Sequence, residues 1–494
     1  MFKRVAANTA WNIFGQLLPL IAALVAIPQL IGQIGLERFG FVSIAWVLVG
    51  YASIFDFGVG KALIRTVSAH LLAERATAAD SSARTALTLL IIFGVMTGIG
   101  LAALSAWLVD SILHVPEELA REALMAMYIL SASLPVVMLS TGYIGIISAH
   151  EQFRRLNIVR AVLGVVSYVF PVLTAFHEAT LPAVVGAVVA IRVLGAVAFR
   201  ALCRRYAGMK ISRPVLDRTS AIELVQLGGW MSVSNIISPL MTYLDRLLLS
   251  AVVPMREVAF YATPFDLISR LMILPYAAMA ALFPQSAGVQ PGSAMAVAMV
   301  DKSMRALAVL MFPPLLIAAA FARPALAIWL GEAFADRAAP VLQLLAVGVL
   351  FNSLAQAPAT LIQSAGQPRV LAQLQLLELP VFLLGLWFLT TKFGIVGTAM
   401  AAALRSTLDA TAVYTLAAIG PARGLGLTRR WLPSLVLFIG CALGVYWAQG
   451  WLACVVVGLG GTFVFLVLAW FTLVDSQERG TLRALLPMRL WPSH

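Results

Sequence analysis

Long apolar segments dominate this chain, and they restrict its fold more than any other feature. A helix that spans a bilayer needs about 20 mostly apolar residues. Fourteen stretches of the 494-residue sequence meet that requirement, with short connections between them. They lie at residues 12–34, 40–63, 85–109, 123–148, 156–177, 180–200, 226–252, 258–285, 303–329, 339–364, 370–391, 394–420, 430–449 and 451–474. The sequence therefore predicts an all-α polytopic membrane protein with about 14 transmembrane helices.

The composition agrees with membrane insertion. Hydrophobic residues make up 61% of the chain and charged residues 11%, whereas soluble proteins carry about 25% charged residues. The three cysteines lie in or beside apolar runs, and they are too few for a disulfide framework or a zinc site. A soluble multidomain enzyme, a disordered protein and a disulfide scaffold are therefore excluded.

The distribution of Lys and Arg predicts the orientation. With a cytoplasmic N-terminus, 24 of the 34 Lys and Arg residues lie on the inner side, 6 on the outer side and 4 deep within helices. Cytoplasmic loops of membrane proteins collect these residues, so both termini are predicted to be cytoplasmic. Insertion then explains the net charge of +12, and nucleic acid is not expected as a partner.

A weak internal repeat predicts two lobes. Trp11 lies 26 residues before a charged turn that begins at Glu37, and Trp230 lies 26 residues before a similar turn at Arg256. Duplicated helix bundles are a common transporter architecture. We predict six-helix lobes at residues 1–205 and 206–425, followed by an added helix pair and a cytoplasmic tail at 426–494.

Nine ionisable residues lie deep inside the predicted helices, where a charge costs about 2.5–3.5 kcal/mol near the bilayer centre. They are the arginines Arg192, Arg246, Arg270 and Arg405 and the acids Asp56, Asp245, Asp266, Glu378 and Asp409. Such groups face a bundle interior or a wet cavity. Asp266 and Arg270 are four residues apart, as are Arg405 and Asp409, so a structural salt bridge within one helix is an alternative for each pair. For Arg192 the alternatives are an anion-binding site and a cross-helix salt bridge.

Motifs of enzymatic chemistry are missing from the sequence. HExxH, GxSxG and Walker patterns do not occur, and the five histidines lie in loops or at segment ends. The expected outer loops are short turns, which leaves little room for a catalytic site. The sequence therefore predicts that the protein is not an enzyme.

Several short motifs carry a family resemblance. They are Asn8-x-x-Trp11-Asn12, Gly35-Leu-Glu-Arg-Phe-Gly40, Tyr51-x4-Asp56-Phe-Gly-Val-Gly60, Tyr243-Leu-Asp-Arg246, Tyr261-x-x-Pro264 and Leu282-Phe-Pro284. With these motifs the chain resembles the Wzx-type polysaccharide flippases of the multidrug/oligosaccharidyl-lipid/polysaccharide (MOP) exporter superfamily. The resemblance covers roughly residues 1–475.

The resemblance implies two six-helix lobes, often with two added helices, and a transport function. Such proteins move undecaprenyl-pyrophosphate-linked oligosaccharides to the outer leaflet of the bacterial inner membrane. The lipid-linked oligosaccharide and membrane lipids are the expected partners, with polysaccharide polymerase machinery as a further candidate. A peptidoglycan-precursor flippase and a multidrug-type cation antiporter of the same superfamily stay open as alternatives.

The expected site follows from the chemistry of this cargo. A guanidinium group matches phosphate oxygens bidentately, so Arg192, Arg246, Arg270 and Arg405 are predicted to bind the pyrophosphate. The five intramembrane acids are predicted to couple or gate transport. No cofactor is expected, and the candidate coupling ions are H⁺ and Na⁺.

Overall fold

The apolar segments fold as helices, and no strand occurs in the part of the chain that the computed structural model describes. The principal stretches outside the description are 51–55, 207–215, 225–243, 280–289, 427–436, 475–478 and 480–494, and side chains are not described for residues 1–17. Within the described residues, ten helices are long and apolar enough to cross a membrane. The predicted all-α polytopic class is confirmed. The helices predicted at 226–252 and 430–449 lie mostly outside the described residues.

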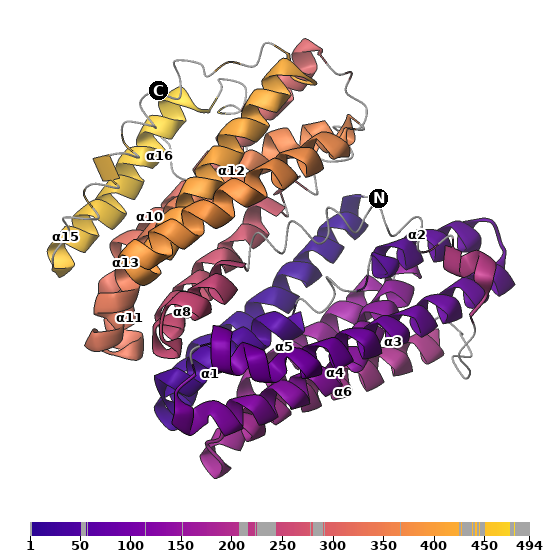
Figure 1. Ribbon diagram of the computed structural model, residues 1–494. Coiled ribbons are helices and arrows are strands. Elements are labelled where there is room, and N and C mark those ends of the chain that lie inside the picture. The colour runs from indigo at the N-terminus through magenta and orange to yellow at the C-terminus, as the bar shows by residue number, and fades with distance from the viewer. Residues whose placement is uncertain are drawn as a thin grey trace. The chain divides into compact units, whose positions relative to one another are not determined.

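The chain divides into two compact units, Met1–Ala262 and Thr263–His494, each with its own helices. Figure 1 shows the helices of each unit running roughly alongside one another. The first unit contains α1 (Phe2–Gly50), α2 (Val59–Leu72), α3 (Ala76–Trp107), α4 (Glu117–Ala149), α5 (Phe153–His177), α6 (Leu181–Tyr206) and the start of α8 (Met255–Ser269). The lobe boundaries from the sequence stay a prediction.

The structure separates the first two predicted helices and also breaks the second one. The backbone is non-helical at Gly35, where φ is 80°, between the predicted segments 12–34 and 40–63, and α1 then continues to Gly50. The prediction of one continuous second helix over 40–63 was wrong, because α2 begins only at Val59. It follows Gly58, whose φ is 73°. The Gly58 N–H donates to Asp56 Oδ1 at 2.7 Å. Such a local side-chain bond competes with the helical hydrogen bonds, and glycine tolerates the left-handed conformation that accompanies it.

Close backbone contact joins α3 to α4. A Cβ atom on Gly94 would lie 2.6 Å from Pro135 Cα, and one on Gly98 would lie 2.7 Å from the Ser131 carbonyl oxygen. Small residues four apart allow such an approach, which drives helix association in lipid through van der Waals contact. The two helices therefore meet backbone to backbone, and larger residues at these glycines would separate them.

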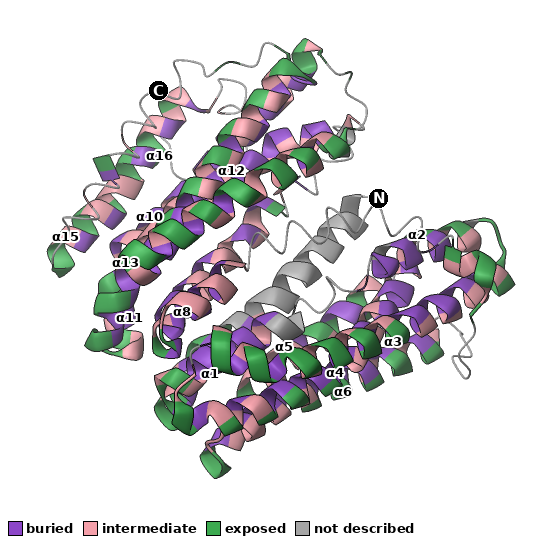
Figure 2. Ribbon diagram, in the orientation of Figure 1, coloured by how far each residue is buried: buried purple, intermediate pink, exposed green. Residues whose placement is uncertain are grey.

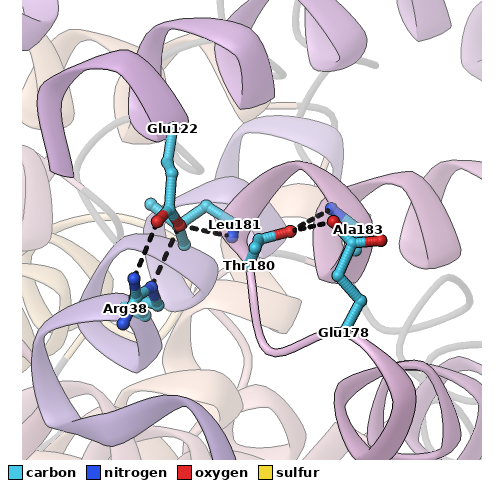
Figure 3. A network of polar contacts seen from close by, with 6 residues as sticks. All are labelled: Arg38, Glu122, Glu178, Thr180, Leu181 and Ala183. Carbon is cyan, nitrogen blue, oxygen red and sulfur yellow. Dashed lines mark hydrogen bonds and ion pairs between the residues drawn. The ribbon is translucent and has the colours of Figure 1, made fainter.

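A polar junction ties three helices together at one end of the first unit (Figure 3). Arg38 in α1 donates two hydrogen bonds to the Glu122 carboxylate in α4, at 3.0 and 2.7 Å. The backbone N–H of Leu181, at the start of α6, donates to Glu122 Oε2 at 2.9 Å. The first N–H groups of a helix have no partner within the helix. Glu122 therefore neutralises an arginine and also caps a neighbouring helix.

After the end of α8 and a 3₁₀ turn (Arg270–Met272), the second unit contains seven described helical elements. The predicted helix 303–329 is split at Phe321, which separates α10 from a short α11. The elements are α10 (Ala294–Ala320), α11 (Ala322–Leu330), α12 (Glu332–Ser364), α13 (Pro368–Ile419), α15 (Trp451–Val455), a π-helical turn (Val456–Gly460) and α16 (Gly461–Thr472).

The long helix α13 is a hairpin rather than a rod. It kinks at Gly394, where φ is 59° and ψ is −136°. The Thr390 and Thr398 hydroxyls hydrogen-bond at 2.9 Å, although eight residues of straight helix would separate them by about 12 Å. The two halves of α13 therefore run back along each other, as the separate predicted segments 370–391 and 394–420 require.

Exposed residues on these helices are largely apolar. Figure 2 shows exposed stripes along the outer faces of the helices in each unit, and they include Met96, Ile99, Leu377 and Leu384. In water such surfaces would be unfavourable, but lipid acyl chains are as apolar as leucine. The exposed stripes therefore fit a chain whose solvent is a bilayer.

Removing the Glu122 side chain should destabilise the first unit. We expect Glu122→Ala to cost about 1–3 kcal/mol, because the Arg38 guanidinium and the Leu181 N–H lose their shared acceptor. Glu122→Gln should cost less, because its amide oxygen still accepts one hydrogen bond. Melting temperature in detergent measures both effects, and Glu118→Ala, an exposed acid of the same helix, is the control. Equal melting temperatures for all three variants would contradict this role.

Candidate functional site

The predicted intramembrane charges occupy several separate places within the two units. In the first unit, Asp56 is 7% exposed and precedes α2. One of its oxygens accepts a hydrogen bond from the Gly58 N–H. The other lies 2.7 Å from the position that a Cβ atom on Gly60 would occupy. Its carboxylate therefore lies at the N-terminus of α2, where the helix dipole favours a negative charge.

Asp245 and Arg246 are among the most buried polar residues, each 2% exposed. They belong to a helical segment at 244–252. Asp245 Oδ1 accepts from the Arg246 N–H at 2.7 Å, and the Tyr261 hydroxyl in α8 donates to the other oxygen. An Arg246 terminal nitrogen donates to the Ala262 carbonyl oxygen at 3.4 Å. Tyr261, on a different helix, therefore supplies a donor to the buried Asp245 carboxylate.

Arg192 lies near the middle of α6 and is half-buried. Its Nε has no hydrogen-bond partner among the described residues. Tyr168 in α5 is close enough to interact with it electrostatically, and the Tyr168 ring packs against Trp46 of α1 with centroids 5.4 Å apart. The surroundings of Arg192 in the described part of the first unit are thus aromatic rather than acidic.

Asp266 and Arg270 fall in the second unit and lie at the end of α8. Asp266 is in the last turn of that helix, and Arg270 begins a 3₁₀ turn, Arg270–Met272. Both are half-buried. Because Ser269 keeps a right-handed helical conformation, the four-residue spacing places the two side chains on one side of the chain.

Glu378, Arg405 and Asp409 are brought together by the α13 hairpin. Glu378 lies in the first half, and the other two lie in the second half. The Glu378 and Asp409 carboxyl groups are close enough to interact electrostatically, and Arg405 attracts both. The Arg405 guanidinium carbon lies 5.2 Å from the centroid of the Phe382 ring. Arg405 Nε has no hydrogen-bond partner among the described residues.

A groove of about 250 Å³ opens beside this charged cluster. Its walls are mostly leucines from both halves of α13, and the polar residues that line it are Glu378 and Arg405. Several of the leucines, including Leu377 and Leu404, are more than half exposed. The groove therefore offers a charged floor between apolar walls, which suits an amphipathic ligand or a small ion.

Sequence reasoning located the charges but missed several of their partners. Phe382 and Tyr168 carry no charge, and an aromatic residue in an apolar segment gives no sign that it faces an arginine. The Arg38–Glu122 contact joins residues 84 positions apart, which no spacing rule links. The contact between Glu378 and Asp409 depends on the hairpin at Gly394, which a hydropathy pattern does not reveal.

Comparison with solved structures defines the class of fold. The chain is similar to the lipid II flippase MurJ in an inward closed conformation, with a TM-score of 0.69 and 11% identity over 95% of this chain and 100% of that one. It is also similar to an inward-facing multidrug resistance MATE family transporter of the MOP superfamily, with a TM-score of 0.65 and 13% identity over 83% and 97% of the two chains. The chain therefore has the fold of these two transporters.

Sequence comparison then identifies the family. Residues 34–338 match the family described as "Polysaccharide biosynthesis protein". The chain is 30% identical over 406 residues to the "Putative O-antigen transporter" of Shigella flexneri, covering 82% of this chain and 96% of that protein. It is 26% identical over 372 residues to the "Uncharacterized membrane protein EpsK" of Bacillus subtilis (strain 168), covering 72% and 71% of the two chains. The chain belongs to the polysaccharide biosynthesis protein family, and the resemblance seen in its sequence is confirmed.

The Asp245–Tyr261 contact should be energetically coupled. We expect Asp245→Asn and Tyr261→Phe each to lower the melting temperature, because each leaves a buried polar group with one partner fewer. The double variant should lose less than the sum of the two, with an interaction energy of about 0.5–3 kcal/mol. Tyr128→Phe, which alters an exposed tyrosine of α4, is the control.

Transport measurements separate two roles for Asp245. If Asp245 has only a structural role, export by Asp245→Asn should fall only in proportion to the amount of folded protein that remains. If Asp245 gates transport, the Asp245→Asn variant should stay inserted and folded but export little polysaccharide. Additive losses of stability in the double variant would show that the Tyr261 contact contributes nothing.

Proposed function

We propose that this protein is a flippase that moves undecaprenyl-pyrophosphate-linked oligosaccharide from the cytoplasmic to the outer leaflet of a bacterial inner membrane. The observation that carries the proposal is the state of Arg192 and Arg405. Each has a buried Nε without a hydrogen-bond partner among the described residues. Arg192 is close enough to Tyr168 to interact with it electrostatically, and Arg405 lies over the Phe382 ring. Family membership supports a transport function, because the Shigella flexneri relative is named as a transporter.

A guanidinium group near the bilayer centre is costly unless a partner compensates its charge. A pyrophosphate headgroup brings negative charge and oxygens at a spacing that a guanidinium fork matches. Arg192 and Arg405 are each proposed to bind such a headgroup, and Arg246 and Arg270 are further candidates. The oligosaccharide would remain hydrated, and the lipid tail would stay among acyl chains.

Alternating access is the proposed mechanism. The cargo is too large to diffuse through a fixed pore with its headgroup shielded from lipid, so the binding arginines must face one leaflet and then the other. The Lys and Arg distribution supports cytoplasmic termini for this cycle. Polysaccharide polymerase machinery, which would use the exported units, remains a candidate partner.

Substitution of the two arginines tests the proposal. Arg192→Ala and Arg405→Ala should lower export at least tenfold while the protein stays inserted, because the anion loses its partner. The Lys variants should keep part of the activity, because the charge survives and the bidentate fork does not. Export is measured by polysaccharide display on cells that lack the native gene, with membrane abundance measured in parallel. Arg256→Ala, at an exposed arginine, is the control, and undiminished export from both Ala variants would refute the anion site.

We further propose that a cation gradient drives the cycle through the Glu378–Asp409 pair. Two acidic groups that interact this closely titrate as a pair, and release or uptake of a proton by the pair would change the charge beside Arg405. Asp56, Asp245 and Asp266 are the other candidate acids. A charge that crosses the membrane gains about 2.3 kcal/mol per 100 mV, so one proton per cycle gives a useful driving force.

Reconstituted transport tests the coupling. Transport in liposomes should accelerate under an inwardly directed proton gradient, and Glu378→Gln should abolish the acceleration while residual transport persists. An imposed sodium gradient separates the two candidate ions. Transport that responds to neither gradient would remove the coupling proposal and leave the anion site untouched.

A further inference from the structure

A second cavity lies at one end of the second unit, where α11 ends and α12 begins. Its volume is about 600 Å³, within the range of about 300–1,000 Å³ typical of small-molecule sites. The first residues of α15 close a third side, and none of the nine predicted site residues lines it. We call it the α11–α12 pocket. Its polar wall contains Arg323, Glu332, Asp336 and Gln343, and its apolar wall contains Ile328 and Trp451.

Ion pairs hold the guanidinium and the two carboxylates of the polar wall in place. An Arg323 terminal nitrogen lies 3.1 Å from Glu332 Oε2 and 2.8 Å from Asp336 Oδ1, and its Nε donates to Asp336 at 2.9 Å. All three side chains are more than half exposed. Exposed ion pairs contribute about 0–1 kcal/mol to stability. Their carboxylate oxygens keep lone pairs that can accept from a ligand.

Trp451 supplies an aromatic surface to the same cavity. Its side chain is 59% exposed, and one side of it packs against Phe321 with ring centroids 6.1 Å apart. The ring is therefore held in place while much of its surface stays accessible. An aromatic face is electron-rich and attracts weakly positive C–H groups.

The charges of the pocket select among ligand classes. Arg323, Glu332 and Asp336 sum to a formal charge of −1, so a phosphate, a nucleotide or an anionic lipid headgroup is disfavoured. A metal ion would have to displace Arg323 from both carboxylates. A neutral pyranose fits both walls, because it has a C–H face for Trp451 and a rim of hydroxyls for the carboxylates, the guanidinium and the Gln343 amide.

We propose that the α11–α12 pocket is a binding site for neutral sugar residues. The inference rests on the proposed function for the source of the sugar, which is the oligosaccharide of the cargo after it has crossed. The Lys and Arg distribution assigns Arg323 to the outer side, where that oligosaccharide emerges. A weak sugar site there would hold the head of the cargo while its pyrophosphate leaves the arginines, and so would bias the cycle toward export.

Saturation-transfer NMR on the whole protein in nanodiscs tests the site. The nanodiscs must be free of sugar-based detergents, whose headgroups would compete. The probes are neutral trisaccharides of hexoses, of 6-deoxyhexoses and of N-acetylhexosamines. We expect at least one probe to bind, and Trp451→Ala and Asp336→Asn each to weaken its affinity at least tenfold. Trp451→Phe keeps a ring and should retain most of the binding.

A matched control guards against general effects of losing a tryptophan. Trp387 in α13 is 54% exposed and does not line the pocket, so Trp387→Ala should bind the probe as the parent protein does. Melting temperatures verify that all variants are folded. The proposal fails if no probe binds, if binding survives both pocket variants, or if inorganic phosphate or Mg²⁺ binds there in preference to sugar.

The test of the sugar site and the test of the proposed flippase function can give different results. Export that depends on Arg192 and Arg405 together with no sugar binding would remove the pocket alone. Sugar binding at Trp451 together with full export from the arginine variants would remove the anion site and leave the pocket in place.

Discussion

Hydrocarbon offers no hydrogen bonds, and every polar group in this chain must find its partner within the protein. That constraint organises the described structure. The Asp56 carboxylate takes an N–H at the start of α2, and Asp245 takes the Tyr261 hydroxyl from α8. The Glu122 carboxylate accepts hydrogen bonds both from an arginine and from the N-terminus of a helix. Each solution uses a group from another element, so the polar contacts fix how helices pack as well as satisfying charge.

The exceptions to this rule carry the functional argument. Arg192 and Arg405 each keep a buried nitrogen without a partner among the described residues, whereas Arg38 and Arg323 are paired with acids. The Phe382 ring reduces the cost of the buried Arg405 guanidinium through attraction to the ring face, and it leaves the hydrogen-bonding edge of that guanidinium free. An arginine held this way is ready for an anionic ligand in a manner that a salt-bridged arginine is not.

Much of the fold could be predicted from the sequence, because bilayer thickness restricts a spanning helix to a narrow range of lengths. The errors occurred where local polar chemistry overrides the apolar pattern. Asp56 interrupts a segment that hydropathy treats as continuous, and Phe321 separates α10 from α11 within another. The charged residues themselves could be found because charge is rare in such segments. Their neighbours could not, because the Arg38–Glu122 contact and the Glu378–Asp409 contact depend on tertiary packing.

The α13 hairpin has a consequence for how the chain enters the membrane. Glu378 is in one half, and Arg405 and Asp409 are in the other. The first half released alone into lipid would carry Glu378 without a compensating charge, because Arg405 lies in the second half. Released as a folded pair, the two halves bring Glu378 near Asp409 and near Arg405, which lies over the Phe382 ring. The turn at Gly394 thus favours entry of the two halves into the bilayer as a hairpin, because only the folded pair places Arg405 beside Glu378.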